Sequence, residues 1–341
     1  MPERACRMMR PMSKLRLTLA CWEYDRTRAL ADGSVQPEGI DLNYINLHVE
    51  ETFFRMLRHR EFEVSEMSLS SYTVSAARGN SPFIAIPVFP SRFFRHSSIY
   101  VSAKSGIREP RDLVGKRIGV PEYQMTAPVW IRGILQDEYG VDPSSPEYFS
   151  GGEEEPGREE KIKLDLPAKF RVRDIGPEKI LAQMIADGEL DALQTARMPS
   201  TYLTRPGTVK RLFENYVEVE KAYFRKSKIF PIMHTVVLRR DVYEANRWIA
   251  RSLCKAFAEA QRRVYENLYV TAALTTMLPW QVAHVEEAQR ELGDDWWAYG
   301  FEANRHVLDT FLRYHHEQGL SKTRMNPEDL FAPETLESFK I

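Results

Sequence analysis

The sequence predicts an α/β protein with two open lobes, each a mostly parallel sheet flanked by helices, and a helical C-terminal region. Strand-like and helix-like segments alternate over the first two hundred residues, which is typical of parallel sheets covered by helices. The 341 residues exceed the usual size of one domain, and 43% apolar with 28% charged residues is typical of a folded protein. We therefore expect two compact units.

The first lobe begins with leucines at alternate positions, as in a half-buried strand. A second strand follows the turn Pro37-Glu38-Gly39, and the serines of Ser68–Ser71 carry an N-cap signal. In order, we predict strand Leu15–Cys21, helix Arg28–Ala31, strand Ile40–Leu47, helix Thr52–Arg60, strand Phe62–Met67, helix Tyr72–Ala77 and strand Phe83–Phe89.

The second lobe begins at about Ser98 and alternates in the same way. In order, we predict strand Ile99–Ser102, strand Arg117–Val120, helix Ala127–Tyr139 with Thr126 as its N-cap, strand Lys169–Ile175, helix Pro177–Asp187 and strand Leu190–Gln194. The stretch Asp142–Glu160 is rich in Pro, Gly and Glu. We interpret its Glu153–Glu155 and Glu159–Glu160 clusters as parts of a solvated loop.

The C-terminal third follows the apolar, β-branched stretch Phe230–Leu238. A helical face is formed by Trp248, Ile249, Leu253, Phe257 and Ala260, and Glu302–His315 is also helical. We expect the chain to cross between lobes near Arg95–Ile99 and to return near Lys228–His234. The predicted lobes are 14–97 with 235–341, and 98–234, after a disordered extension over 1–13.

Charge and cysteine content exclude several classes of protein. The 47 basic and 48 acidic residues give a net charge of −1, which argues against nucleic-acid binding through a broadly basic surface. No stretch approaches the roughly 18–20 apolar residues of a membrane span. Three widely spaced cysteines (Cys6, Cys21 and Cys254) form no metal, redox or disulfide pattern. We expect a cytoplasmic protein, without nucleic-acid or membrane partners.

In open α/β sheets, ligands bind beyond the carboxyl ends of the strands. This rule selects four loops: Cys21–Thr27, Ser68–Ser71, Tyr123–Thr126 and Gln194–Arg197. Three of them precede helices, whose first N–H groups favour an anion. We expect a small carboxylate ligand in a cleft between the lobes.

Candidate side chains lie in or near these loops and at the two crossings. Arg26, Arg92, Arg95 and Arg197 are candidates for carboxylate binding, although each is as suited to a surface salt bridge. His96 and His234 lie at the two crossings and are candidates for proton transfer. Glu66 lies inside a strand, so its charge must be paired or its pKa raised if it is buried.

Other constellations are missing from the sequence. There is no GxGxxG, P-loop, GxSxG or HExxH motif, and the pair His315-His316 falls on a predicted surface helix. We therefore predict no dedicated metal site, while assistance by a divalent ion through scattered ligands stays open. The aromatic group Trp296, Trp297, Tyr299 and Phe301 is interpreted as packing.

Two motifs resemble type II periplasmic-binding-protein folds: Asp112–Val120 and Gly188–Ala192. Longer stretches resemble the 4,5-dihydroxyphthalate decarboxylase family, which acts in bacterial phthalate breakdown and aromatic catabolism. They are Gly33–Ile40, Glu66–Tyr72, Ile86–Ser97 and Leu330–Thr335. The likeness covers nearly the whole chain from about Leu15.

The resemblance implies a carboxy-lyase that converts 4,5-dihydroxyphthalate to protocatechuate and carbon dioxide without an organic cofactor. Protonation of the ring carbon would precede loss of carbon dioxide. We expect His96 and His234 to transfer protons, in roles that stay unassigned, and Glu66 to orient one of them. Arg92, Arg95 and Arg197 would hold the carboxylates, with Ser70, Ser71 and Thr126 adding hydrogen bonds. Arg26 and Tyr123 are further candidates for substrate binding.

The sequence leaves three alternatives open. The first is a carboxylate-binding protein of the same fold without catalytic activity. The second is a biosynthetic enzyme for a thiamine-pyrimidine or menaquinone precursor, and the third is a sensory domain, for which no DNA-binding helix-turn-helix is evident. The aromatic C-terminal region hints weakly at a homo-oligomer.

Overall fold

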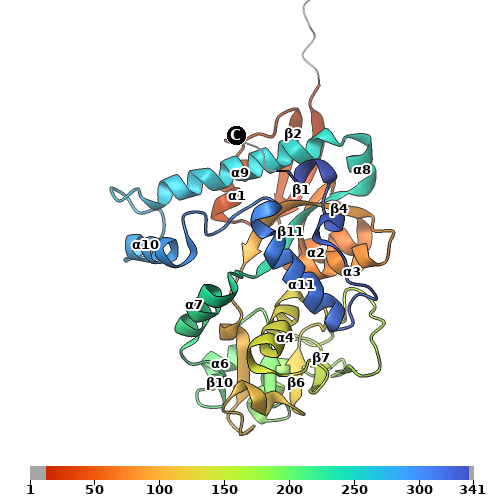
Figure 1. Cartoon of the computed structure of the whole chain (residues 1–341), viewed down its shortest axis with the longest axis vertical. Coiled ribbons are helices and arrows are strands. Elements are labelled where there is room, and N and C mark those ends of the chain that lie inside the picture. The colour runs from red at the N-terminus through yellow and green to blue at the C-terminus, as the bar shows by residue number, and fades with distance from the viewer. Residues whose placement is uncertain (1–12, 338–341) are drawn as a thin grey trace, which may run out of the picture.

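The computed structural model describes residues 13–337 and contains two separate β-sheets. Figure 1 shows one sheet above the other, with the earliest and latest parts of the chain around the upper sheet and the middle of the chain around the lower one. The predicted extension over 1–13 lies, apart from Ser13, outside the described residues. No helix in the described part of the chain is long and apolar enough to cross a membrane.

The upper sheet has five strands in the order β2-β1-β3-β11-β4. Their bounds are β1 Leu15–Cys21, β2 Ile40–Asn46, β3 Val64–Ser68, β4 Phe83–Arg92 and β11 Ile232–Arg239. β1 is parallel to β2 and β3, whereas β11 is antiparallel to β3 and β4. The sheet is mixed because the strand that returns from the lower lobe is inserted between β3 and β4.

The lower sheet has six strands in the order β10-β5-β9-β6-β7-β8. Their bounds are β5 Ile99–Ser102, β6 Arg117–Val120, β7 Glu147–Ser150, β8 Arg171–Asp174, β9 Ala192–Gln194 and β10 Val209–Arg211. The neighbours from β9 to β8 are parallel, and β5 is antiparallel to both β9 and β10. The four central strands therefore have the direction predicted for a parallel sheet.

Helices cover the sheets and join the two lobes. They are α1 Asp25–Ala31, α2 Val49–His59, α3 Leu69–Ala77, α4 Thr126–Tyr139, α5 Leu181–Asp187, α6 Ser200–Thr204, α7 Tyr216–Ser227, α8 Arg240–Ala245, α9 Trp248–Leu268, α10 Gln281–Leu292 and α11 Arg305–Glu317, with short 3₁₀ turns η1 His96–Ser98, η2 Pro110–Leu113, η3 Glu302–Asn304, η4 Pro327–Leu330 and η5 Pro333–Thr335. α9 lies along the upper sheet, as its apolar face predicts, and packs against α1 and β4.

The C-terminal helix α11 also contacts the lower lobe, which our division of the chain does not anticipate. It packs against α4, where Gly133 faces the ring of Tyr314. Gln318, just after α11, accepts a hydrogen bond from the buried Arg132 at 2.7 Å and donates one to the Val129 carbonyl at 2.9 Å. The described chain passes between the sheets after β4 and before β11, close to the predicted crossings.

Three local predictions are wrong. β7 lies in the stretch rich in Pro, Gly and Glu, where no strand was predicted, and its Tyr148 is buried between β6 and β8. Thr126 is the first residue of α4 and not its cap, since its hydroxyl instead contacts Ser68 and the Ser70 N–H. His315, predicted on a surface helix, is fully buried in the α4–α11 region.

Candidate active site

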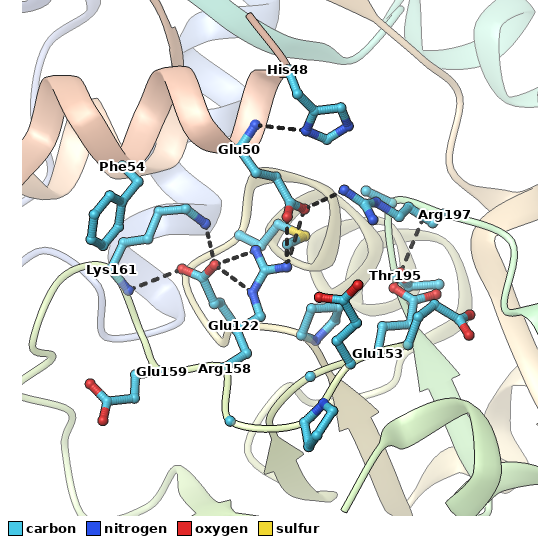
Figure 2. A pocket seen from close by; sticks show the side chains of 18 of the residues that line it. His48, Glu50, Phe54, Glu122, Glu153, Arg158, Glu159, Lys161, Thr195 and Arg197 are labelled. Carbon is cyan, nitrogen blue, oxygen red and sulfur yellow. Dashed lines mark hydrogen bonds and ion pairs between the residues drawn. The ribbon is translucent and has the colours of Figure 1, made fainter. Parts of the chain in front are cut away.

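All four loops selected by the carboxyl-end rule line one cleft between the two lobes. This inner cleft has a volume of about 370 Å³. Its walls are, from the upper lobe, Trp22, Tyr24, His48, Val49, Glu50, Phe53, Ser68, Ser71, Ser91, Phe93, Arg95, Met233 and His234, and from the lower lobe, Glu122, Gln124, Met125, Thr126, Ala127, Arg158, Lys161, Ala196 and Arg197. It opens into an outer cleft of about 640 Å³ that is lined by the acidic loop 152–159 (Figure 2).

The inner cleft contains a hydrogen-bonded pair formed by His234 of β11 and Glu66 of β3. These strands are neighbours, and His234 Nδ1 lies 2.6 Å from Glu66 Oε1. Glu66 is fully buried and also accepts hydrogen bonds from the Tyr24 hydroxyl at 2.6 Å and the Trp22 N–H at 3.0 Å. The loop after β1 therefore holds the carboxylate in place.

These contacts determine the protonation state of Glu66. Burial opposes its ionisation, but the hydrogen bonds from His234, Tyr24 and Trp22 outweigh burial and hold its pKa below the usual value. An ionised carboxylate only accepts, so His234 donates from Nδ1. Nε2 of His234 has no hydrogen bond to any described residue, and the side chain is 17% exposed. His234 is thus oriented with one nitrogen left for a ligand.

A cluster of ion pairs spans the mouth of the inner cleft (Figure 2). Arg158 donates to both oxygens of Glu50 at 3.1 Å and to Glu122 at 2.5 Å. Arg197 also pairs with Glu50, at 2.9 Å, and Lys161 pairs with the fully buried Glu122. Burial alone would raise the pKa of both carboxyls, but their cationic partners hold both pKa values low.

Arg95 is a buried cation without a carboxylate at ion-pair distance among the described residues. Its Nε contacts Met233 Sδ at 3.1 Å, and Nη1 makes two long contacts of 3.4 Å, to Ser98 Oγ and the Ala196 carbonyl. Burial lowers the pKa of Arg95 to about 9. A desolvated guanidinium with such weak partners favours an incoming anion.

Hydroxyl groups lie at the base of the cleft, where the lobes touch. Ser68 caps α3 and its Oγ lies 2.9 Å from Thr126 Oγ1. The Ser71 hydroxyl donates to Gln124 Oε1 at 2.8 Å. These contacts place Ser71 and Thr126 at the cleft, as predicted, and use them to join the two lobes.

His96 does not reach the cleft, which corrects our expectation that both histidines face it. It is 1% exposed and packed between Phe213 and Tyr223, each with ring centroids 5.3 Å away. Burial lowers its pKa to about 4, and neither ring nitrogen has a hydrogen-bond partner among the described residues. The turn η1 that follows the crossing directs this side chain into the aromatic core.

Four further candidates also lie outside the cleft walls. Arg92 is buried behind them, where it donates to the carbonyls of Phe230 and Ala298 and to Asn304. Arg26 stacks on Trp297 and donates to the Pro90 carbonyl. The Tyr123 hydroxyl donates to the Gln318 carbonyl, and the Ser70 N–H donates to the Thr126 hydroxyl. None of the four is among the residues that line the inner cleft.

The sequence reasoning missed His48, Glu50, Glu122, Arg158 and Lys161. His48 precedes α2, and its Nδ1 accepts from the Glu50 N–H at 3.4 Å, so a neutral ring carries its proton on Nε2. The strand-end rule could have selected it, since β2 ends at Asn46. Arg158 lies between the two Glu clusters interpreted as solvated and Lys161 directly follows them, and only the tertiary structure brings both to Glu122.

Glu153 contradicts most directly the interpretation of the acidic clusters as parts of a solvated loop. It is 5% exposed, accepts a hydrogen bond from the Thr195 hydroxyl and leaves Oε1 without a partner among the described residues. Burial raises its pKa to about 7, and nearby Glu154 acts in the same direction. The side chain lines the outer cleft with Arg197 and Arg158 (Figure 2).

Two relatives identify the family. The chain is 45% identical to 4,5-dihydroxyphthalate decarboxylase of Comamonas testosteroni over 330 residues, which cover 97% of this chain and 100% of that protein. A protein of the same name from Pseudomonas putida is 47% identical over 204 residues, covering 60% of this chain and 79% of that protein. The chain belongs to the 4,5-dihydroxyphthalate decarboxylase family. No family model matches it.

Solved structures confirm the predicted fold for this member of the 4,5-dihydroxyphthalate decarboxylase family. A periplasmic sulfonate-binding protein of Methylobacillus flagellatus KT has a TM-score of 0.55 at 14% identity, covering 94% of this chain and 92% of that one. The periplasmic aliphatic sulphonate-binding protein of Escherichia coli has a TM-score of 0.51 at 11% identity, covering 95% and 99%. At such identities the likeness concerns the fold alone.

The decarboxylase-family cleft combines two chemical capacities. His234, oriented by Glu66, can give or take a proton at Nε2. Four cationic side chains (Arg95, Arg158, Lys161 and Arg197) lie in the walls with two carboxylates (Glu50 and Glu122), and the ionised Glu66 lies directly behind His234, so cations exceed carboxylates by one. No group of three or more His, Cys, Asp or Glu side chains within residues 13–337 is arranged to hold a metal ion.

Proposed function

We propose that this chain decarboxylates 4,5-dihydroxyphthalate to protocatechuate and carbon dioxide in the inner cleft. The observation that carries the proposal is the Glu66–His234 pair, which presents a free imidazole nitrogen to a cleft in which cations outnumber carboxylates. The family relation supports the same reaction.

Charge and shape support an aromatic diacid as the ligand. Its two carboxylates suit the cationic walls, and a volume of about 370 Å³ suits a single substituted ring. We propose that Arg95 binds one carboxylate, because it is the buried cation in the cleft walls that has no carboxylate at ion-pair distance among the described residues. Phe53, which packs edge-on to His234 with ring centroids 4.9 Å apart, offers an apolar surface for the ring.

The reaction requires two proton transfers at opposite ends of the ring. A base takes the proton of the hydroxyl para to the departing carboxylate, and electron density moves into the ring. An acid protonates the carbon that bears this carboxylate, which forms a cyclohexadienone. The carbon–carboxylate bond then breaks, carbon dioxide leaves, and the bond's electron pair restores the aromatic ring. The para oxygen regains its proton, and water reprotonates the acid, so each turnover consumes one proton.

We assign one transfer to His234 and the other to His48, in place of His96. His48 lines the same cleft and contacts Trp22 with ring centroids 5.2 Å apart. Its Nδ1 contact to the Glu50 N–H leaves Nε2 for the ligand. Which histidine acts as the acid depends on how the ring lies in the cleft.

Carbon dioxide release from purified protein tests the proposal. Incubation with 4,5-dihydroxyphthalate should yield one equivalent each of carbon dioxide and protocatechuate, and in D₂O the vacated carbon should carry one deuterium. Phthalate lacks the hydroxyl that drives the reaction, so it should bind and be recovered intact. Return of 4,5-dihydroxyphthalate unchanged would favour the carboxylate-binding alternative.

The proposal includes chemistry without an organic cofactor or resident metal, since both proton transfers and the charge balance come from side chains. Extensive dialysis against EDTA should leave turnover unchanged, and metal analysis of the dialysed protein checks the treatment. Loss of activity that Mg²⁺ or Mn²⁺ restores would contradict this part.

A cytoplasmic location is also proposed, in keeping with the free thiols of Cys21 and Cys254.

A further inference from the structure

We propose that Glu50 occupies the place of a substrate carboxylate, and that an aromatic diacid binds by displacing it from Arg158 and Arg197. Glu50 would then set how strongly the cleft selects diacids. The inference rests on the proposed function only for its ligand, an aromatic dicarboxylate.

The geometry of Glu50 matches that of a bound carboxylate. Both of its oxygens accept from Arg158 Nη1 at 3.1 Å, and Oε1 also accepts from Arg197 Nη2 at 2.9 Å. Carboxylates of ligands are recognised by guanidinium groups in the same manner. Figure 2 shows Glu50 reaching down from α2 to both arginines.

Glu50 is also the carboxylate in this cluster that a ligand can replace. Its side chain is 31% exposed, whereas Glu122 is 1% exposed and tied to Arg158, Lys161 and Gln124. Glu50 comes from the upper lobe and both arginines from the lower lobe, so a modest change in either lobe separates them. The side chain of Arg197 is 45% exposed and free to follow an incoming anion.

Displacement explains how one cleft can bind a diacid and release a monoacid. A diacid supplies one carboxylate for Arg95 and another for the arginines that Glu50 gives up. After decarboxylation one carboxylate is gone, so Glu50 can pair with Arg158 and Arg197 again. An internal competitor of this kind weakens binding of every anion but favours release of the product.

The test is the affinity for phthalate, which the proposed route cannot decarboxylate. Glu50→Gln keeps the size of the side chain and removes its charge. Isothermal titration of the whole protein should show that this variant binds phthalate about tenfold more tightly. The rate of protocatechuate release should fall by a similar factor. Glu50→Asp, which withdraws the charge, should give an intermediate gain. Glu51→Gln is the matched control, since Glu51 pairs with Arg55 on the same helix outside the cleft.

Each outcome decides the inference. Equal or weaker phthalate binding by Glu50→Gln would overturn the inference. Weaker binding would show that the Glu50 ion pairs support anion binding. No binding of phthalate to either protein would overturn it as well. Failure of the proposed function is separate, because it appears as the absence of carbon dioxide release from the parent protein, whatever the affinity of Glu50→Gln.

Discussion

At the scale of single residues, His96 and His234 differ in environment although both lie at crossings between the lobes. His234 lies in a strand beside an ionised carboxylate and keeps one nitrogen for a ligand. His96 is surrounded by aromatic rings, and burial keeps it neutral. The two crossings thus place their histidines in different surroundings, because one side chain points to the cleft and the other to the core.

Replacing these two histidines separates the roles. His234→Gln should lower kcat by about 10²-fold or more, because a proton-transfer group is lost, while phthalate affinity stays within about threefold. His96→Phe suits its aromatic surroundings and should keep kcat within about threefold of the parent. Initial rates of protocatechuate formation measure both. A large loss in His96→Phe with a small one in His234→Gln would reverse our assignment.

Glu153 predicts a pH dependence of anion binding. Its pKa of about 7 means that the carboxyl is neutral below pH 7 and negative above it. The negative form lies beside Arg197 and Arg158 and weakens their attraction for an anion. Ionisation of Glu153 should therefore lower phthalate affinity about threefold between pH 6 and pH 8. Glu153→Gln should retain the low-pH affinity across this range, measured by titration calorimetry.

The comparison needs a control because other groups titrate in the same range. Glu155→Gln changes another acidic residue of the same loop, and it should keep the parental pH dependence. An unchanged pH profile in Glu153→Gln would show that Glu153 stays charged, or that its charge does not reach the anion.

At the scale of elements, the contact between α4 and α11 ties the C-terminal helices to the lower lobe. Gly133 lies so close to the Tyr314 ring that a Cβ atom there would overlap it. Tyr314 is itself held by a 2.6 Å hydrogen bond to Asp137 of α4. A glycine inside a helix is unfavourable by itself, so close packing explains its presence.

Gly133→Ala should therefore destabilise the protein despite the better helix propensity of alanine. We expect the free energy of unfolding in urea to fall by about 1–3 kcal/mol, the usual cost of overpacking. In a Tyr314→Ala background the same change should be neutral or stabilising, because space is then available. A destabilisation of equal size in both backgrounds would locate the cause in the backbone rather than in the ring.

At the scale of the whole molecule, charge is distributed so that a nearly neutral chain carries a positive cleft. The net charge is −1, yet cations outnumber carboxylates around the inner cleft. Such a concentration of charge attracts a dianion without making the whole surface basic.

Ionic strength should therefore affect binding and leave the chemistry unchanged. Raising NaCl from 50 to 500 mM should increase KM for 4,5-dihydroxyphthalate by about three- to tenfold, because salt screens the attraction of a dianion, while kcat changes little. Sodium sulfate at the same ionic strength should raise KM further if a small dianion competes for the arginines. A KM independent of salt would contradict electrostatic capture.

Much of the fold could be predicted because it depends on local patterns. Alternating leucines locate β1, and the bounds of β1, β5 and β6 agree with the prediction. The rule that ligands bind at strand ends selected four loops that meet at the cleft. Errors arose where a long-range contact overrides composition, as for β7 and Glu153 in a stretch rich in Glu, Pro and Gly.

Local periodicity was enough to predict the α/β architecture and the loops at the strand ends, and four short stretches of sequence carried the family resemblance. Which charged side chains share the cleft became clear from the three-dimensional arrangement alone. Arg158 meets Glu50 across 108 residues of chain, and His234 meets Glu66 across 168. Such pairings depend on how the lobes stack and where each side chain finds space, and composition does not encode either.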